Sequence, residues 1–150
     1  MGSREFPDHF SGHADLYARL RPGYPPSLFD FLSAAAPGDA LAIDVGTGNG
    51  QAARELASRF ARVVATDASA AQLQHAPSLP NVTYRQNLAQ LTGEEAGSCQ
   101  LLTAAQAAHW FDWPAFGAEL RRVLAPGGFL ALWTQELCRV EEGYAQLWVE

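Results

Sequence analysis

Residues 41–50, Leu-Ala-Ile-Asp-Val-Gly-Thr-Gly-Asn-Gly, constrain the fold of this chain more than any other segment. An apolar run that contains Asp44 is followed by three glycines at alternate positions, the first of them Gly46. Glycine is required where the main chain adopts angles closed to other residues, or where a ligand approaches the backbone closely. We therefore predict a short buried strand that turns into a nucleotide-cofactor loop and then into a helix.

The spacing of these glycines distinguishes two kinds of cofactor loop. A dinucleotide-binding loop follows the pattern G-x-G-x-x-G and would require glycine or alanine at position 51, where this chain has Gln51. The chain also contains no lysine, so it cannot supply the catalytic Tyr-x-x-x-Lys of a nicotinamide-dependent oxidoreductase. Both observations disfavour a nicotinamide oxidoreductase.

Strands and helices are expected to alternate along the chain, and this alternation predicts a three-layer α/β fold with a doubly wound, mostly parallel sheet. No internal repeat or linker interrupts the sequence, so we expect a single domain over residues 1–150, with cap helices in 10–36, a core in 37–135 and a final helix in 136–150. The strands are predicted at 40–45, 62–66, 81–85, 99–105 and 129–134. The other helices are predicted at 14–20, 27–36, 51–60 and 112–124, the last of them capped by Asp112. A tight turn is predicted at 125–128.

Composition limits the kinds of partner that we expect. The chain is 48% hydrophobic and 17% charged, which is typical of a folded globular protein. Its net charge of −6 argues against non-specific binding to nucleic acid, which needs a basic surface. Every apolar run is shorter than the ~18 residues of a membrane span. Cys99 and Cys138 lie far apart without metal-ligand spacing, so we expect reduced thiols, a cytoplasmic location and no bound metal.

Asp67 is the first candidate for a ligand contact outside the glycine loop. In a doubly wound sheet the ligand lies beyond the carboxyl ends of the strands. Asp67 follows the second predicted strand, about 20 residues after the glycines, where an acidic side chain can accept hydrogen bonds from both ribose hydroxyls. The alternative is that Asp67 only caps the next helix, a role for which Ser69 is equally well placed.

Four segments occur in a fixed order along the chain: Tyr17-x-x-x-Arg21-Pro-x-Tyr24-Pro, the loop D-x-G-x-G-x-G from Asp44, Leu-Leu-Thr-Ala-Ala-Gln-Ala-Ala-His-Trp-Phe-Asp at 101–112, and Arg-Val-Leu-Ala-Pro-Gly-Gly at 122–128 followed by Leu-Ala-Leu-Trp at 130–133. Together they resemble the class I S-adenosylmethionine (SAM)-dependent methyltransferases. The resemblance is to the branch that includes trans-aconitate methyltransferase and relatives of the quinone-biosynthesis C-methyltransferases. It extends over roughly residues 10–135 and implies a Rossmann-like fold.

The resemblance implies SAM as the cofactor and assigns parts of that molecule to parts of the chain. The glycine loop would line the methionine portion, Asp67 would hold the ribose, and Ala68 would lie against the adenine. Tyr17 and Arg21 would close over the amino-acid group, and Asp44 would organise the loop. The residues assigned to the cofactor in this way are Tyr17, Arg21, Asp44, Gly46, Thr47, Gly48, Gly50, Asp67, Ala68, Ala89, Gln90 and Gln106.

Two positions depart from the family pattern. The wider family often has an acidic residue directly before the alanine at position 89, for the adenine amino group, and this chain has Leu88 there, preceded by Asn87. An acidic residue is also usual within the fourth strand, where Gln100 stands. These departures concern affinity for adenine more than the fold.

The chain supplies the first five strands of the seven that the resemblance implies, followed by about one helix. We therefore expect the amino-terminal portion of a methyltransferase, lacking the last two strands: a truncated form, a short isoform or a natural minimal variant. The apolar strand at 129–133 would then have an unpaired edge, which favours pairing with a second chain. A homodimer is expected, formed through strand five or through the helix at 136–150.

His109 is the candidate catalytic residue, because it follows the fourth strand at the methyl end of the cofactor. An imidazole with an ordinary pKa of about 6.5 could act as a general base. Alternatively, His109 and Trp110 could form the wall of the pocket, since methyl transfer from a sulfonium needs mostly alignment. The aromatic neighbours are expected mainly in the core, namely Phe111, Trp113 and Phe116.

The predicted function is methyl transfer from SAM to a small molecule, at a carboxylate, a hydroxyl or an activated carbon. Tyr24 and Trp110 are assigned to the substrate pocket. The alternative is a non-catalytic SAM-binding or interaction module derived from a truncated methyltransferase.

Overall fold

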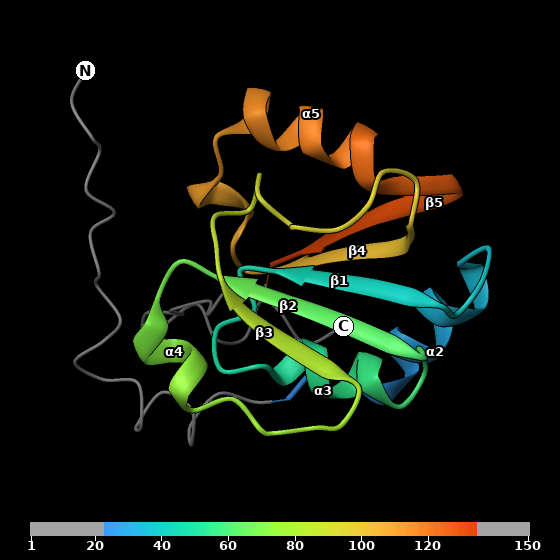
Figure 1. Cartoon of the computed structure of the whole chain (residues 1–150). Coiled ribbons are helices and arrows are strands. Elements are labelled where there is room, and N and C mark those ends of the chain that lie inside the picture. The colour runs from blue at the N-terminus through green and yellow to red at the C-terminus, as the bar shows by residue number, and fades with distance from the viewer. Residues whose placement is uncertain (1–22, 135–150) are drawn as a thin grey trace, which may run out of the picture.

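The computed structural model describes residues 23–134 of the chain. Its elements are α2 (Pro26–Ala35), β1 (Leu41–Val45), α3 (Gln51–Ala57), β2 (Arg62–Asp67), α4 (Ala70–Gln74), β3 (Val82–Gln86), β4 (Cys99–Ala105), the 3-10 turn η1 (Ala108–Trp110), α5 (Trp113–Val123) and β5 (Leu124–Trp133). Within this range five strands form one sheet in the order β3-β2-β1-β4-β5, and every neighbouring pair is parallel (Figure 1). The predicted doubly wound α/β sheet is therefore confirmed. The predicted helices at 14–20 and 136–150, together with Tyr17 and Arg21, lie outside the described residues.

The sheet carries a hydrophobic core on each of its faces, with α2 and α3 on one side and α5 on the other (Figure 1). All five residues of β1 are buried, because this strand lies between β2 and β4 and has helices on both faces. Side chains alternate between the faces along a strand, so Ala42 packs with α2 and α3, whereas Ile43 packs with α5. Phe29 and Phe116, both fully buried, anchor the two helical layers.

β5 begins earlier than the sequence predicts. The segment Ala-Pro-Gly-Gly at 125–128 predicts a tight turn before a strand at 129, but the strand already starts at Leu124. Its pairing with β4 passes from Leu124 to Phe129, so residues 125–128 lie opposite a single residue of β4. Residues 125–128 therefore form an irregularity within β5 rather than a turn that precedes it, because the residues on both sides of them pair with β4.

Two helices differ slightly in length from the prediction. α3 ends at Ala57 rather than at residue 60, although Phe60 still packs into the core and is 3% exposed. α5 ends one residue before Leu124, which has an extended backbone. Asp112 caps α5 as predicted, because its side chain accepts a hydrogen bond from the amide of Ala115.

The strands of a parallel sheet bring their carboxyl ends to one edge, where the ligand of a doubly wound fold lies. In this chain the loops that leave β1, β2 and β4 at that edge begin at Gly46, Ala68 and Gln106. These loops contain most of the residues predicted for the site. The fold therefore places these residues at the carboxyl edge of the sheet.

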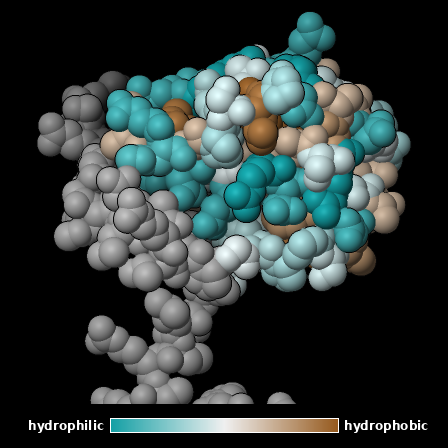
Figure 2. Space-filling model, turned by 90° about the horizontal axis from the view of Figure 1, so that it is seen from below, coloured by the Kyte–Doolittle hydropathy of each residue, from teal (hydrophilic) through white to brown (hydrophobic). Residues whose placement is uncertain are grey.

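Figure 2 shows the molecule from below the view of Figure 1. On this face hydrophilic residues predominate among the coloured residues, and hydrophobic ones are scattered between them. None of the helices between residues 23 and 134 is long and apolar enough to cross a membrane.

Candidate functional site

The glycine loop lies between β1 and α3 at the ligand edge of the sheet. Gly46, Gly48 and Gly50 have positive φ angles of 66°, 59° and 83°. A Cβ at Gly46 would lie 2.4 Å from the Cβ of Ala107, and a Cβ at Gly50 would lie 2.9 Å from the hydroxyl of Tyr84. Glycine is therefore required at both positions by the left-handed backbone and by the lack of space for a side chain.

Asp67, the last residue of β2, joins the glycine loop to the start of α4. Its Oδ2 accepts a hydrogen bond from the amide of Gly48 at 2.8 Å, and its Oδ1 accepts one from the amide of Ser69 at 2.8 Å. The N-cap of α4 is Ser69, whose hydroxyl accepts from the amide of Gln72. Because each carboxylate oxygen has two lone pairs, Asp67 can accept further hydrogen bonds from a ligand while it holds the loop.

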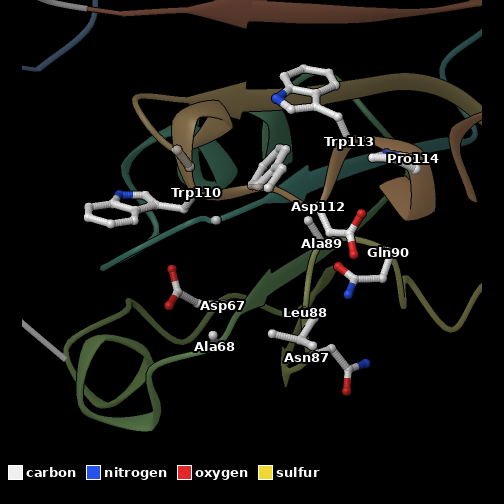
Figure 3. A pocket seen from close by; sticks show the side chains of 13 residues that line it. Asp67, Ala68, Asn87, Leu88, Ala89, Gln90, Trp110, Asp112, Trp113 and Pro114 are labelled. Atoms are coloured by element: carbon white, nitrogen blue, oxygen red, sulfur yellow. The ribbon is translucent and has the colours of Figure 1, made fainter. Parts of the chain in front are cut away.

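A pocket of about 760 Å³ opens beside Asp67 (Figure 3). This volume is typical of a site for a small molecule or cofactor, which ranges over about 300–1,000 Å³. Its walls are formed by the end of β2, by residues 87–90 after β3 and by the segment 107–114 after β4. The residues predicted for the cofactor or substrate that line it are Gly46, Asp67, Ala68, Ala89, Gln90 and Trp110.

Asp44 lies buried beneath the loop rather than in the pocket wall. It is 1% exposed, and its Oδ1 accepts a hydrogen bond from the hydroxyl of Thr103 at 2.6 Å. Thr47 is also buried, and its amide donates to the carbonyl of Thr66 at 2.9 Å. These contacts fix the loop against β4 and β2, which is a structural role.

Tyr24 and Gln106 contact each other but do not belong to the pocket lining. Gln106 has a φ of 56°, and its amide donates to the carbonyl of Trp133 at 2.8 Å. Its side-chain amide donates to the hydroxyl of Tyr24 at 3.5 Å. The rings of Tyr24 and Trp133 meet edge-on with centroids 5.4 Å apart. Binding roles for Tyr24 and Gln106 stay predictions.

His109 is exposed on η1 and does not line the pocket. Its ring packs against that of Trp110, with centroids 4.9 Å apart, and Trp110 does line the pocket. The histidine therefore lies at the rim, next to a lining residue. Its role as a base or as part of the wall stays a prediction.

Of the aromatic wall of the pocket, the sequence pattern indicated only Trp110. Phe111, Asp112 and Trp113 also line the pocket, although the sequence predicts these aromatic residues as core and Asp112 only as a helix cap. Trp113 is 47% exposed, whereas Phe116 is fully buried and holds Phe111 and Trp113 at centroid distances of 4.7 and 5.6 Å. The available signal was their position directly after β4, the same signal that singled out His109.

An ionic cluster attaches the β3–β4 loop, which carries the wall at 87–90, to α5. Glu119 accepts hydrogen bonds from the amide of Thr92 at 3.1 Å and from the hydroxyl of Thr92. Nε and Nη2 of Arg122 each donate to Glu119 at 2.7 Å, and Nη2 also donates to the carbonyl of Glu94 at 2.8 Å. The hydrogen bonds from Arg122 and from Thr92 lower the pKa of the Glu119 carboxyl to about 2.

Glu94 extends this cluster to the sheet. Its carboxylate pairs with Arg62 of β2 and, at 2.9 Å, with Arg85 of β3. Burial raises the pKa of the Glu94 carboxyl, but the two arginines outweigh burial and hold it below its ordinary value. Arg85 also donates to the carbonyl of Thr92 at 3.0 Å. The loop is thus fixed at Thr92 and Glu94 from three different elements.

Metal and thiol chemistry find no support in the described part of the chain. Between residues 23 and 134 no group of three or more His, Cys, Asp or Glu residues could hold a metal ion. Cys99 is buried in β4, and burial raises the pKa of its thiol to about 12. This thiol is therefore protonated at neutral pH and is not a nucleophile.

Comparison with known proteins adds an independent observation. Residues 43–132 match the model of a methyltransferase domain family, and this match includes the glycine loop and all walls of the pocket. The chain belongs to this methyltransferase family. A protein named as a methyltransferase from Dictyostelium discoideum is 36% identical over 137 residues, which are 91% of this chain and 52% of the relative. The trans-aconitate 2-methyltransferase of Deinococcus radiodurans is 40% identical over 98 residues, which are 62% of this chain and 37% of the relative.

Solved structures agree with this result. A structure described as a type II methyltransferase from Anaeromyxobacter dehalogenans has a TM-score of 0.76 and 46% identity, and the match covers 81% of this chain and 52% of that chain. The YcgJ protein of Bacillus subtilis has a TM-score of 0.63 and 25% identity, over 71% of this chain and 49% of that chain. The predicted family and its Rossmann-like fold are confirmed, and the family implies SAM as methyl donor. The chain spans about half the length of the Dictyostelium discoideum relative and of the two solved structures, and 37% of the Deinococcus radiodurans protein.

Proposed function

We propose that this chain binds SAM in the pocket beside Asp67 and transfers its methyl group to a small molecule. One observation carries this proposal: Asp67 has two roles at once. Its carboxylate accepts a hydrogen bond from the amide of Gly48 in the glycine loop, and Asp67 also lines the pocket. A single side chain would then meet the ribose hydroxyls and fix the loop that receives the methionine portion.

When bound, SAM supplies a methyl group on a positively charged and electrophilic sulfur. The chain then contributes mainly alignment and exclusion of water. Gly46 and Ala107 both line the pocket and are in close contact, so they join the glycine loop to the wall after β4. Trp110 in that wall offers an aromatic face, which attracts a cationic group.

The acceptor is proposed to be a small molecule that presents a carboxylate, a hydroxyl or an activated carbon. The name of the Deinococcus radiodurans relative supports a carboxylate, because trans-aconitate is a carboxylic acid. A carboxylate acceptor needs no base. A hydroxyl acceptor must lose a proton, and we propose His109, whose ring packs on that of the lining residue Trp110, as the base that takes it. The net charge of −6 supports a small-molecule acceptor over nucleic acid.

A second candidate function is SAM binding without turnover. It is favoured by Leu88, which lines the pocket at the position where the wider family often has an acidic residue for the adenine amino group. The sheet edge adds a proposal about partners: β5 is the outer strand among the described strands, and its Leu132 is 42% exposed. We propose self-association of the chain through this edge.

A cytoplasmic location is also proposed. It is supported by the free thiol of Cys99, because cysteines stay reduced in the cytoplasm.

Calorimetric titration of the 150-residue chain with SAM, and separately with NAD, tests the binding step. We expect SAM to bind and NAD not to bind. Asp67→Ala should weaken SAM binding by about 10- to 100-fold, because it removes charge-assisted hydrogen bonds to the ribose. Asp39→Ala, which truncates an exposed aspartate, is the matched control and should bind as the wild type does. Equal affinity of Asp67→Ala and the wild type would refute the assignment.

A turnover assay separates the two candidate functions. The chain is incubated with SAM and a panel of carboxylates and phenols, and release of S-adenosylhomocysteine is measured. Release that depends on one class of acceptor supports the transferase. Tight SAM binding without release on any acceptor supports the binding module.

A further inference from the structure

The pocket is lined by two carboxylates on different walls, and the proposed function uses only one of them. Asp67 belongs to the wall at the end of β2, and Asp112 belongs to the wall after β4. In Figure 3 the carboxylate of Asp112 is directed toward the loop that carries Ala89 and Gln90. Asp112 therefore faces the β3–β4 loop within the same pocket.

The β3–β4 loop itself contributes no carboxylate to the pocket lining. At the position where an acidic residue would be expected it has Leu88, which is 44% exposed and lines the pocket. Adenine presents an amine, which donates hydrogen bonds, beside a ring nitrogen, which accepts them. An amine enclosed by apolar groups is unfavourable unless it finds an acceptor. The loop offers only the neutral amide oxygens of Asn87 and Gln90 among its lining side chains, so a charged acceptor for this amine has to come from another wall.

Asp112 is able to accept this hydrogen bond while it caps α5. Its Oδ1 accepts from the amide of Ala115 at 3.3 Å. An ionised carboxylate has about four acceptor positions and no donor, so acceptor capacity remains for a ligand. Phe111 and Trp113 flank Asp112 on the same wall with ring centroids 6.1 Å apart, and they supply apolar surface for a purine.

We propose that Asp112 accepts the hydrogen bond from the exocyclic amine of the adenine in bound SAM. It thereby takes over the task of the carboxylate that is missing at Leu88, and it makes the pocket selective for adenine over hypoxanthine. Hypoxanthine has an oxygen where adenine has the amine, and this oxygen would face the negative carboxylate. The proposal rests on SAM binding as the proposed function and extends it from the ribose to the base.

The test compares S-adenosylhomocysteine with S-inosylhomocysteine, which differ only in the base, by calorimetric titration. The wild-type chain should prefer the adenosyl compound by about 10- to 100-fold, as expected for a hydrogen bond to a charged group. In Asp112→Asn this preference should fall about tenfold, because the amide can also donate to the oxygen of hypoxanthine. Asparagine caps helices as well as aspartate does, so α5 keeps its cap. Asp39→Asn is the matched control and should keep the wild-type preference.

Leu88→Asp in the Asp112→Asn background gives a second measurement. It returns a carboxylate to the loop wall, so the preference for the adenosyl compound should recover. Should circular dichroism show that Asp112→Asn is unfolded, Asp112→Ser replaces it, because serine also caps helices but is too short to reach the base. If the wild type and the Asp112 variant showed the same preference for the adenosyl compound, the role of Asp112 would be overturned and the proposed function would stand. A wild type that binds neither compound would overturn the proposed function itself.

Discussion

Glu119→Gln is expected to destabilise the chain and to change the pH dependence of its stability. The Glu119 carboxylate accepts hydrogen bonds from Arg122 through Nε and Nη2 and from Thr92 through its amide and hydroxyl. A glutamine keeps one acceptor oxygen and turns an NH₂ group toward these donors. The substitution therefore removes the charge and leaves at least one donor without a partner.

The magnitude follows from the pKa of Glu119, which is lowered from 4.5 to about 2. Taken alone, this difference corresponds to about 3 kcal/mol of unfolding free energy. The side chain of Arg122 is 42% exposed, so solvent screens the pair and we expect about 1–2 kcal/mol. Because the folded-state pKa lies below the unfolded one, the stabilisation is present above pH 4.5 and is lost as the pH falls toward 2.

Urea unfolding at pH 7, 5, 4 and 3, followed by tryptophan fluorescence, measures both effects. Glu119→Gln should be less stable than the wild type by about 1–2 kcal/mol at pH 7, and the difference should narrow between pH 5 and pH 3. Glu95→Gln makes the same change at an exposed carboxylate of the same loop and should stay within about 0.5 kcal/mol of the wild type. A difference that is absent at pH 7, or that does not narrow on acidification, would refute this reasoning.

Further perturbations test the loop, the rim and the edge. In the same urea assay, Gly46→Ala should lower the unfolding free energy by about 2–4 kcal/mol, because the new Cβ would meet that of Ala107 and the backbone there is left-handed. Gly38→Ala is the control and should change the unfolding free energy little, because the nearest atom to its new Cβ lies at 3.6 Å. If His109 is a base, His109→Gln should lower turnover by roughly 10²–10⁴-fold at unchanged SAM affinity; a loss below about tenfold assigns it to the wall. Light scattering at micromolar concentration should show a dimer or larger assembly, and Leu132→Lys should shift it toward monomer; a monomeric wild type would contradict pairing through β5.

Much of the fold could be predicted because its signals are local. The strand at 41–45 is an apolar run, and the glycines that follow it are required by the backbone itself. Asp112 caps α5 because its side chain bonds an amide only three residues away. The strand predicted from residue 129 starts at Leu124 instead, because pairing with β4 continues on both sides of residues 125–128. No pattern within the segment itself reports that pairing.

The site was predicted less completely, because its walls come from distant segments. The position of Asp67 after β2 could be predicted from its distance to the glycine loop, and the structure places both beside one pocket. That Trp113 faces the pocket while Phe116 faces the core depends on how α5 rests on the sheet. The bond between Thr92 and Glu119 joins residues 27 positions apart, and no local pattern marks the buried Thr92 as a partner.

α5 links two walls of the pocket, and this link separates the effects of two substitutions. The helix begins directly after Asp112 in one wall, and further along it Glu119 holds Thr92, two residues beyond the other wall at 87–90. Loss of the hydrogen bonds to Glu119 should therefore displace the loop wall as a whole. Such a displacement should lower the binding affinity for the adenosyl and the inosyl compound by the same factor. Asp112→Asn, by contrast, should leave the walls in place and change only the preference between the bases. If Glu119→Gln altered that preference as strongly as Asp112→Asn does, the selectivity would depend on the position of the loop rather than on the Asp112 carboxylate.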